Sequence, residues 1–121
     1  MATRDLTEQD FNDTISANDI VLVDFWASWC GPCRAFAPTF TASSEKHPDI
    51  VFGKVDTEAQ EQIAKAAEIR AIPTLMAFKK GHLVFNQAGA LPPAALEDLI
   101  AQIRSFDLDA AAADVPPVTD L

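Results

Sequence analysis

Two cysteines are the residues of this sequence whose type and spacing most directly suggest chemistry. Cys30 and Cys33 enclose a Gly-Pro dipeptide, and the 121-residue chain holds no other cysteine. A disulfide between positions three apart closes almost no loop, so it removes little entropy from the unfolded chain and adds little stability. The spacing therefore favours a reactive pair that exchanges between dithiol and disulfide over a bridge that holds the fold together.

A buried strand followed by a helix should position this pair. Residues 20–27 form a short, nearly continuous apolar run rich in β-branched and aromatic residues, which is typical of a strand buried on both faces. A helix should then run from about Cys30 to Lys46, with a kink at Pro38. The sequence thus predicts that the first cysteine lies where the strand gives way to the helix.

This position gives the two sulfurs different roles. Unpaired N–H groups and the helix dipole favour the thiolate form of Cys30, which is the nucleophilic form. Cys33 lies one turn further on the same helical face and should be the less exposed. We therefore expect Cys30 to attack a substrate disulfide and Cys33 to resolve the mixed disulfide. The alternative is an inert pair or half of a zinc site, but the only histidines, His47 and His82, lack the spacing of paired ligands.

The remaining elements alternate between helices and strands. We expect helices over 7–17, over 57–67 and from 92 onward, and strands near 3–6 and over 50–56, 74–78 and 83–85. Thr7 and Thr57 are the expected N-caps, Thr57 in a capping box with Gln60, and Gly81 should allow the turn of a closing hairpin. This order predicts an α/β domain with one central sheet covered by helices on both faces.

Length, composition and charge restrict the remaining choices. We expect one domain over residues 1–106 and an acidic, disordered tail over residues 107–121, which are rich in Ala, Asp and Pro. The net charge of −9 argues against nucleic acid and anionic membrane surfaces as partners. No apolar run has the length of a membrane span, and the first ten residues lack the apolar core of a secretory signal. A cytoplasmic monomer is therefore expected, although a secreted form already freed of its signal would look the same.

The segment Trp29-Cys30-Gly31-Pro32-Cys33 resembles the active-site signature of the thioredoxin family. The resemblance covers residues 6–106 and includes residues 23–27, Ala37-Pro38, Ile72-Pro73-Thr74, Gly81 and Gly89-Ala90. It implies the thioredoxin fold, a central mixed β-sheet of four to five strands flanked by four helices.

The resemblance also implies a docking surface around the reactive pair. Pro73 matches the proline that family members hold in a cis peptide after Ile72, next to the disulfide. Ala71 stands where many members have glycine, so the surface before Pro73 should be slightly bulkier. The flat apolar surface expected to bind substrates consists of Trp29, Gly31, Pro32, Ile72, Pro73, Thr74, Gly89 and Ala90.

Asp24 interrupts the apolar run that precedes the cysteines. A buried carboxyl is costly unless it is paired or protonated, and burial should raise its pKa. Near neutral pH it could then take the proton from Cys33. In the family this aspartate has that proposed role, and Lys54 matches its lysine partner. An aspartate paired with Lys54 for structure only is the alternative.

The Gly31-Pro32 dipeptide favours a reductant, because oxidising relatives carry a thiolate-stabilising group there. The expected function is protein disulfide reduction without a bound metal or cofactor. The resemblance implies electrons from NADPH through thioredoxin reductase, and disulfide-containing proteins such as reductases and peroxidases as substrates. Two alternatives stay open. The chain could be a disulfide isomerase or a dedicated peroxidase electron donor, or a binding module whose partners need the fold but not the thiols.

Overall fold

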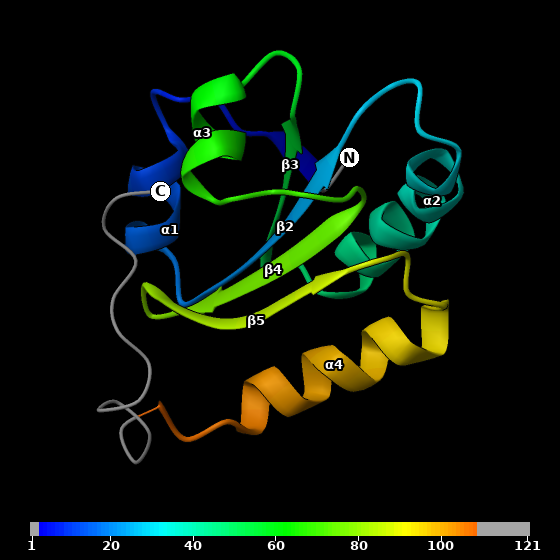
Figure 1. The fold of residues 1–121 in the computed structure, drawn as a ribbon. Coiled ribbons are helices and arrows are strands. Elements are labelled where there is room, and N and C mark those ends of the chain that lie inside the picture. The colour runs from blue at the N-terminus through cyan, green and yellow to red at the C-terminus, as the bar shows by residue number, and fades with distance from the viewer. Residues whose placement is uncertain (1–2, 109–121) are drawn as a thin grey trace.

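Five strands and four helices alternate along residues 3–108, the part of the chain that the computed structural model describes (Figure 1). Their order is β1 (Thr3–Asp5), α1 (Phe11–Ala17), β2 (Ile20–Trp26), α2 (Gly31–Lys46), β3 (Val51–Asp56), α3 (Glu61–Ala66), β4 (Thr74–Lys79), β5 (His82–Ala88) and α4 (Pro93–Ser105).

The strands form one mixed sheet in the order β1-β3-β2-β4-β5. β1 and β2 run parallel to β3, whereas β4 is antiparallel to both β2 and β5. One face packs against α1 and α3, and the other against α2 and α4 (Figure 1). This arrangement confirms the predicted mixed sheet with four flanking helices.

β2 lies at the centre of the sheet and is buried on both faces, as predicted. Successive side chains of a strand point to opposite faces. Val23 and Phe25 belong to the core beneath α1 and α3, whereas Ile20 and Leu22 belong to the core beneath α2 and α4. Asp24 continues the second series, so its carboxyl lies on the face that α2 covers.

The first helix begins later than expected. α1 starts at Phe11, and Thr7 does not cap it. Instead, the Asp10 carboxylate accepts a hydrogen bond from the Thr7 N–H at 2.7 Å, and the Thr7 carbonyl accepts from the N–H groups of Asp10 and Phe11. The acidic side chain therefore closes a turn in front of the helix, and Asp10 rather than Thr7 is the N-cap residue.

The capping box predicted for the third helix is also wrong. The Thr57 hydroxyl donates to the Trp26 carbonyl at 3.1 Å and so ties this loop to the end of β2. The Asp56 carboxylate accepts from the N–H of Glu58 at 2.9 Å and forms a separate turn. One contact with a distant segment and one local turn thus hold these residues outside the helix, and α3 begins only at Glu61.

The closing hairpin has the expected turn and a longer second strand. Lys80 and Gly81 both have positive φ, at 52° and 83°, as a two-residue type I′ turn requires. β5 extends to Ala88, beyond the predicted residue 85, because its pairing with β4 continues as far as Thr74.

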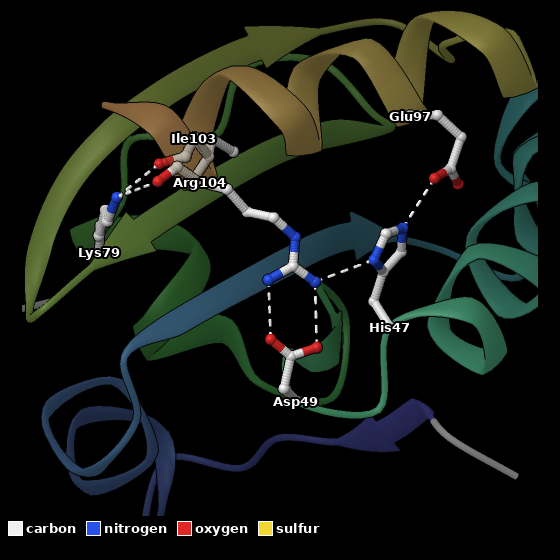
Figure 2. A network of polar contacts seen from close by, with 6 residues as sticks. All are labelled: His47, Asp49, Lys79, Glu97, Ile103 and Arg104. Atoms are coloured by element: carbon white, nitrogen blue, oxygen red, sulfur yellow. Dashed lines mark hydrogen bonds and ion pairs between the residues drawn. The ribbon is translucent and has the colours of Figure 1, made fainter. Parts of the chain in front are cut away.

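The C-terminal end of α4 is held by contacts that the sequence did not reveal. The buried Lys79 ammonium donates to the carbonyls of Ile103 at 2.7 Å and Arg104 at 3.0 Å (Figure 2). It also donates to the Phe106 carbonyl at 2.9 Å. The Ile103 carbonyl also accepts from the Phe106 N–H at 3.2 Å, and the last carbonyls of a helix lack the donors that a further turn would supply. Lys79 therefore anchors α4 to the edge half of the sheet.

A second set of polar contacts joins the segment directly after α2 to α4 (Figure 2). The Arg104 guanidinium binds the Asp49 carboxylate through two nitrogens, at 2.7 and 3.0 Å, and contacts His47 Nδ1 at 3.0 Å. His47 Nε2 lies 2.7 Å from the Glu97 carboxylate. The helix that begins at the cysteines is thus fixed at its far end.

Two further expectations concern the C-terminal tail and a membrane span. The disordered tail was predicted over residues 107–121, but Leu108 is buried, so the packed part of the chain extends past the predicted boundary. Residues 109–121 of the predicted tail lie outside the described residues. Within residues 3–108, no helix is both long enough and apolar enough to cross a membrane.

Candidate active site

The reactive pair lies at the N-terminus of α2, as predicted. Cys30 is the N-cap residue in an extended conformation, with φ −86° and ψ 115°, and a disulfide joins it to Cys33. Pro32 occupies the first turn, where its missing N–H costs no helical hydrogen bond. The end of β2 and the start of this helix therefore fix the position of both sulfurs.

Hydrogen bonding distinguishes the two sulfurs more clearly than exposure does. The side chain of Cys30 accepts a hydrogen bond from the backbone N–H of Cys33 at 3.2 Å. The exposed fractions are only 4 % for Cys30 and 2 % for Cys33. A backbone donor together with the helix dipole favours negative charge on the N-cap sulfur when the bridge is reduced.

The loop before β4 brings further predicted residues to the disulfide. The Ile72 carbonyl oxygen lies 3.7 Å from Cys30 Sγ, and the Ile72–Pro73 peptide is cis. The Pro73 carbonyl in turn accepts from the N–H of Gly89 at 2.7 Å. Segments around residues 30, 72 and 89, far apart in the sequence, therefore meet at one site.

The residues expected to bind substrates differ in what they offer at the surface. Trp29 is 65 % exposed, and Gly31, Pro32, Gly89 and Ala90 are also exposed. Ile72 is half-buried, whereas Pro73 and Thr74 are buried. The two buried residues therefore shape the surface from beneath more than they contribute side-chain area to it.

A groove beside Trp29 contains residues that the sequence analysis missed. It has a volume of about 320 Å³ and is lined by Trp29, Thr57, Ala64, Ile69, Arg70, Ala71 and Ile72. The indole Nε1 of Trp29 donates to the Glu58 carboxylate, which holds the ring at the edge of the groove. The only signal that could have suggested Arg70 as a site residue is its position two residues before Ile72. No sequence signal indicated that Glu58 lies beside Trp29.

Asp24 is a buried carboxyl without a hydrogen-bond partner. It is 1 % exposed, and neither carboxyl oxygen has a partner within the described residues. Burial raises the pKa of Asp24 to about 7, against the opposing attraction of Lys54, which lowers it. Near neutral pH this carboxyl can therefore exist in both protonation states.

Lys54 is the neighbour of Asp24 across the β2–β3 pair. Its ammonium lies 5.1 Å from the centre of the Trp26 ring, within the range of a cation–π contact. No ion pair within 4 Å joins Lys54 to Asp24 in the region that the structure describes. The geometry thus lacks the close structural pair that was the alternative interpretation of Asp24.

Helix α2 covers the face on which Asp24 lies. Phe36 and Phe40 of this helix pack in the same core as Leu22, the previous residue on that face of β2. The helix carrying Cys33 therefore lies over the strand carrying Asp24. Among residues 3–108, no group of three or more His, Cys, Asp and Glu side chains could hold a metal ion.

Comparison with known proteins agrees with this geometry. The Thioredoxin family model matches residues 2–102. The chain is 52% identical over 108 residues to putative thioredoxin 2 of Streptomyces coelicolor, covering 89% of this chain and 81% of that protein. It is 40% identical over 101 residues to thioredoxin-1 of Saccharomyces cerevisiae, covering 84% and 97%.

A solved structure of Plasmodium falciparum thioredoxin superposes with a TM-score of 0.77 at 35% sequence identity, over 83% of this chain and 98% of that one. The family model spans all five strands, the cysteine pair and the helices up to residue 102, within α4. The chain therefore belongs to the thioredoxin family, and it is a protein disulfide oxidoreductase.

Proposed function

We propose that this chain reduces protein disulfides by a two-step exchange, with Cys30 as the attacking and Cys33 as the resolving cysteine. The observation that supports this assignment is the hydrogen bond from the Cys33 N–H to the Cys30 side chain at the start of α2. It stabilises a thiolate at position 30, and the corresponding sulfur of Cys33 lies one turn into the helix without that benefit.

In the first step the Cys30 thiolate attacks one sulfur of the substrate disulfide. The substrate S–S bond breaks, one substrate thiolate leaves, and a mixed disulfide with Cys30 forms. In the second step Cys33 loses its proton and attacks Cys30 Sγ, which releases the second substrate thiolate. Two electrons pass to the substrate, and the protein is left with its Cys30–Cys33 bridge.

Asp24 is the proposed acceptor of the Cys33 proton. A pKa of about 7 suits this task, because the group is available as a base and can release the proton again near neutral pH. Lys54 acts as a positioning residue, since its charge favours the ionised form that accepts the proton. The place of Asp24 beneath α2 supports the assignment.

Substrates are proposed to dock on the surface formed by Trp29, Gly31, Pro32, Ile72, Pro73, Thr74, Gly89 and Ala90. The exposed Trp29 and the Ile72 carbonyl beside Cys30 Sγ support this choice. An apolar rim around a nearly buried sulfur would exclude water while a substrate disulfide approaches.

We further propose that electrons come from NADPH through thioredoxin reductase, with reductases and peroxidases among the substrates. A cytoplasmic location fits this role, because a reducing compartment keeps the dithiol available. The acting unit is proposed to be a monomer whose single domain extends to Leu108, with the residues after it as an acidic tail.

The test is insulin reduction coupled to NADPH oxidation by a thioredoxin reductase, followed by trapping. Cys30→Ser should abolish turnover, and Cys33→Ser should accumulate a mixed disulfide with substrate. Accumulation by Cys30→Ser instead would reverse the two roles. Full biological activity in a Cys30→Ser, Cys33→Ser double variant would favour a binding module, and activity confined to one peroxidase would favour a dedicated donor.

A further inference from the structure

Two arginines flank the active-site disulfide of a chain that is otherwise strongly acidic. The sequence has 9 Lys and Arg against 18 Asp and Glu. Arg34 directly follows Cys33, is exposed, and donates from Nη1 to the Ser28 carbonyl at 3.0 Å. That contact folds the guanidinium back toward the loop that carries Trp29.

Arg70 reaches the same surface from the loop before β4. It lines the groove that Trp29 and Ile72 also line, and its side chain is exposed. The Ile72 carbonyl, two residues further on, lies 3.7 Å from Cys30 Sγ. The two cationic side chains therefore border the face through which a substrate disulfide must approach.

Neither charge is neutralised within the protein. In the described part of the chain, no carboxylate lies within salt-bridge distance of Arg34 or Arg70. By contrast, the Lys79 ammonium donates hydrogen bonds to carbonyls at the end of α4, and Arg104 forms an ion pair with Asp49. The charges beside the disulfide thus remain available for a bound partner.

Glu58 adds a carboxylate to this surface, and it does not cancel the two arginines. Glu58 accepts the hydrogen bond from Trp29 Nε1, so one of its oxygens is already occupied. A guanidinium presents two parallel N–H donors that match a carboxylate in a bidentate geometry. The local chemistry therefore suits an acidic side chain on the substrate better than a basic one.

We infer that Arg34 and Arg70 are specificity-determining residues that favour disulfides flanked by aspartate or glutamate in the substrate. This inference rests on the proposed reductase function and names a substrate class for its docking surface. The net charge of −9 repels acidic proteins at long range, so the preference must act locally, within a Debye length of about 8 Å at physiological salt.

Three synthetic peptides provide the test. Each has one disulfide, and the residue next to the target cysteine is Glu, Gln or Lys. The rate constant for oxidation of the dithiol protein is measured by stopped flow and divided by the rate of the same peptide with dithiothreitol, which corrects for intrinsic reactivity. Exposed ion pairs change affinity by about 1.4- to fivefold each, so two contributions of about twofold give a corrected Glu/Gln ratio of about four at low salt. It should fall toward one at 0.5 M salt.

Variants then assign the preference to residues. Arg34→Gln and Arg70→Gln should each lower the Glu/Gln ratio about twofold or more, and the double variant should bring it close to one. Lys46→Gln is the matched control, because it removes the same charge at the other end of α2, ~20 Å from Cys33 at 1.5 Å per residue. Its ratio should equal that of the parent.

An unchanged ratio in the double variant would overturn the inference. An equal fall in Lys46→Gln would also overturn it, because net charge alone would then explain the preference. If the parent protein reduced none of the three peptides, the proposed reductase function would fail, and that result differs from a loss of charge preference.

Discussion

Replacing Asp24 by asparagine should stabilise the folded protein while it slows the chemistry. The pKa of this carboxyl is raised from 3.8 to about 7, chiefly because burial penalises the charged form. Each tenfold change in proton affinity is worth about 1.4 kcal/mol, so the ionised carboxyl destabilises the fold by up to about 4 kcal/mol. Asparagine fills the same space and carries no charge.

The sign of the pH dependence follows from the same shift. A raised pKa means that the folded state holds the proton more tightly than the unfolded state. The stability of the parent is therefore highest below pH 3.8 with respect to this group, and it is lost as the pH rises through about 7. The difference between Asp24→Asn and the parent should be small at pH 4 and reach its full value above pH 7.

Urea unfolding of the oxidised proteins at several pH values between 4 and 8.5 measures this difference directly. Asp98→Asn, at an exposed position of α4, is the control that removes the same charge without removing a buried carboxyl. Turnover in insulin reduction should fall tenfold or more in Asp24→Asn, a modest estimate for loss of a general base. A variant less stable than the parent at pH 8 would refute the reasoning, because the carboxylate would then be well paired.

Three further predictions concern the sulfurs and the contacts around α4. In the reduced protein, iodoacetamide should alkylate Cys30 well before Cys33, as peptide mass spectrometry can follow, and equal rates would contradict the assigned roles. Lys79→Met should lower the free energy of unfolding by about 2–4 kcal/mol, because the carbonyls that end α4 lose a charged donor. A loss below about 0.5 kcal/mol in urea unfolding would show that water replaces the ammonium. Finally, the hydrogen bonds from Arg104 are the largest cause that lowers the pKa of Asp49 to about 2, so carboxyl NMR should find this value in the parent and a higher one in Arg104→Gln. The same low value in both proteins would rule out Arg104 as the cause.

The sequence predicted well those features that rest on local pattern. Each of these features depends on only a few neighbouring residues and was found where expected. They are the apolar run of β2, the proline in the first turn of α2, and the spacing of Cys30 and Cys33. Asp24 is the lone acidic residue within that apolar run, and this pattern alone was enough to predict its burial.

Features that depend on contacts between distant segments were missed. Lys79 could be taken for an ordinary hairpin lysine, because its carbonyl partners lie 24 to 27 residues away. Thr57 fits the pattern of a helix cap, but the carbonyl of Trp26, 31 residues earlier, takes its hydroxyl instead. Likewise, the groove that holds Arg70 forms only when the loop before β4 packs beside Trp29.

An equilibrium redox titration tests the central claim most directly. The protein is held in buffers of reduced and oxidised dithiothreitol or glutathione, and free thiols are counted after acid quenching and alkylation. We predict one two-electron transition shared by Cys30 and Cys33, at a potential far more reducing than the about −120 mV of a strong disulfide oxidant. A pair that stays in one state across these buffers, or one with a potential near that of the oxidant, would contradict a disulfide reductase built on these two sulfurs.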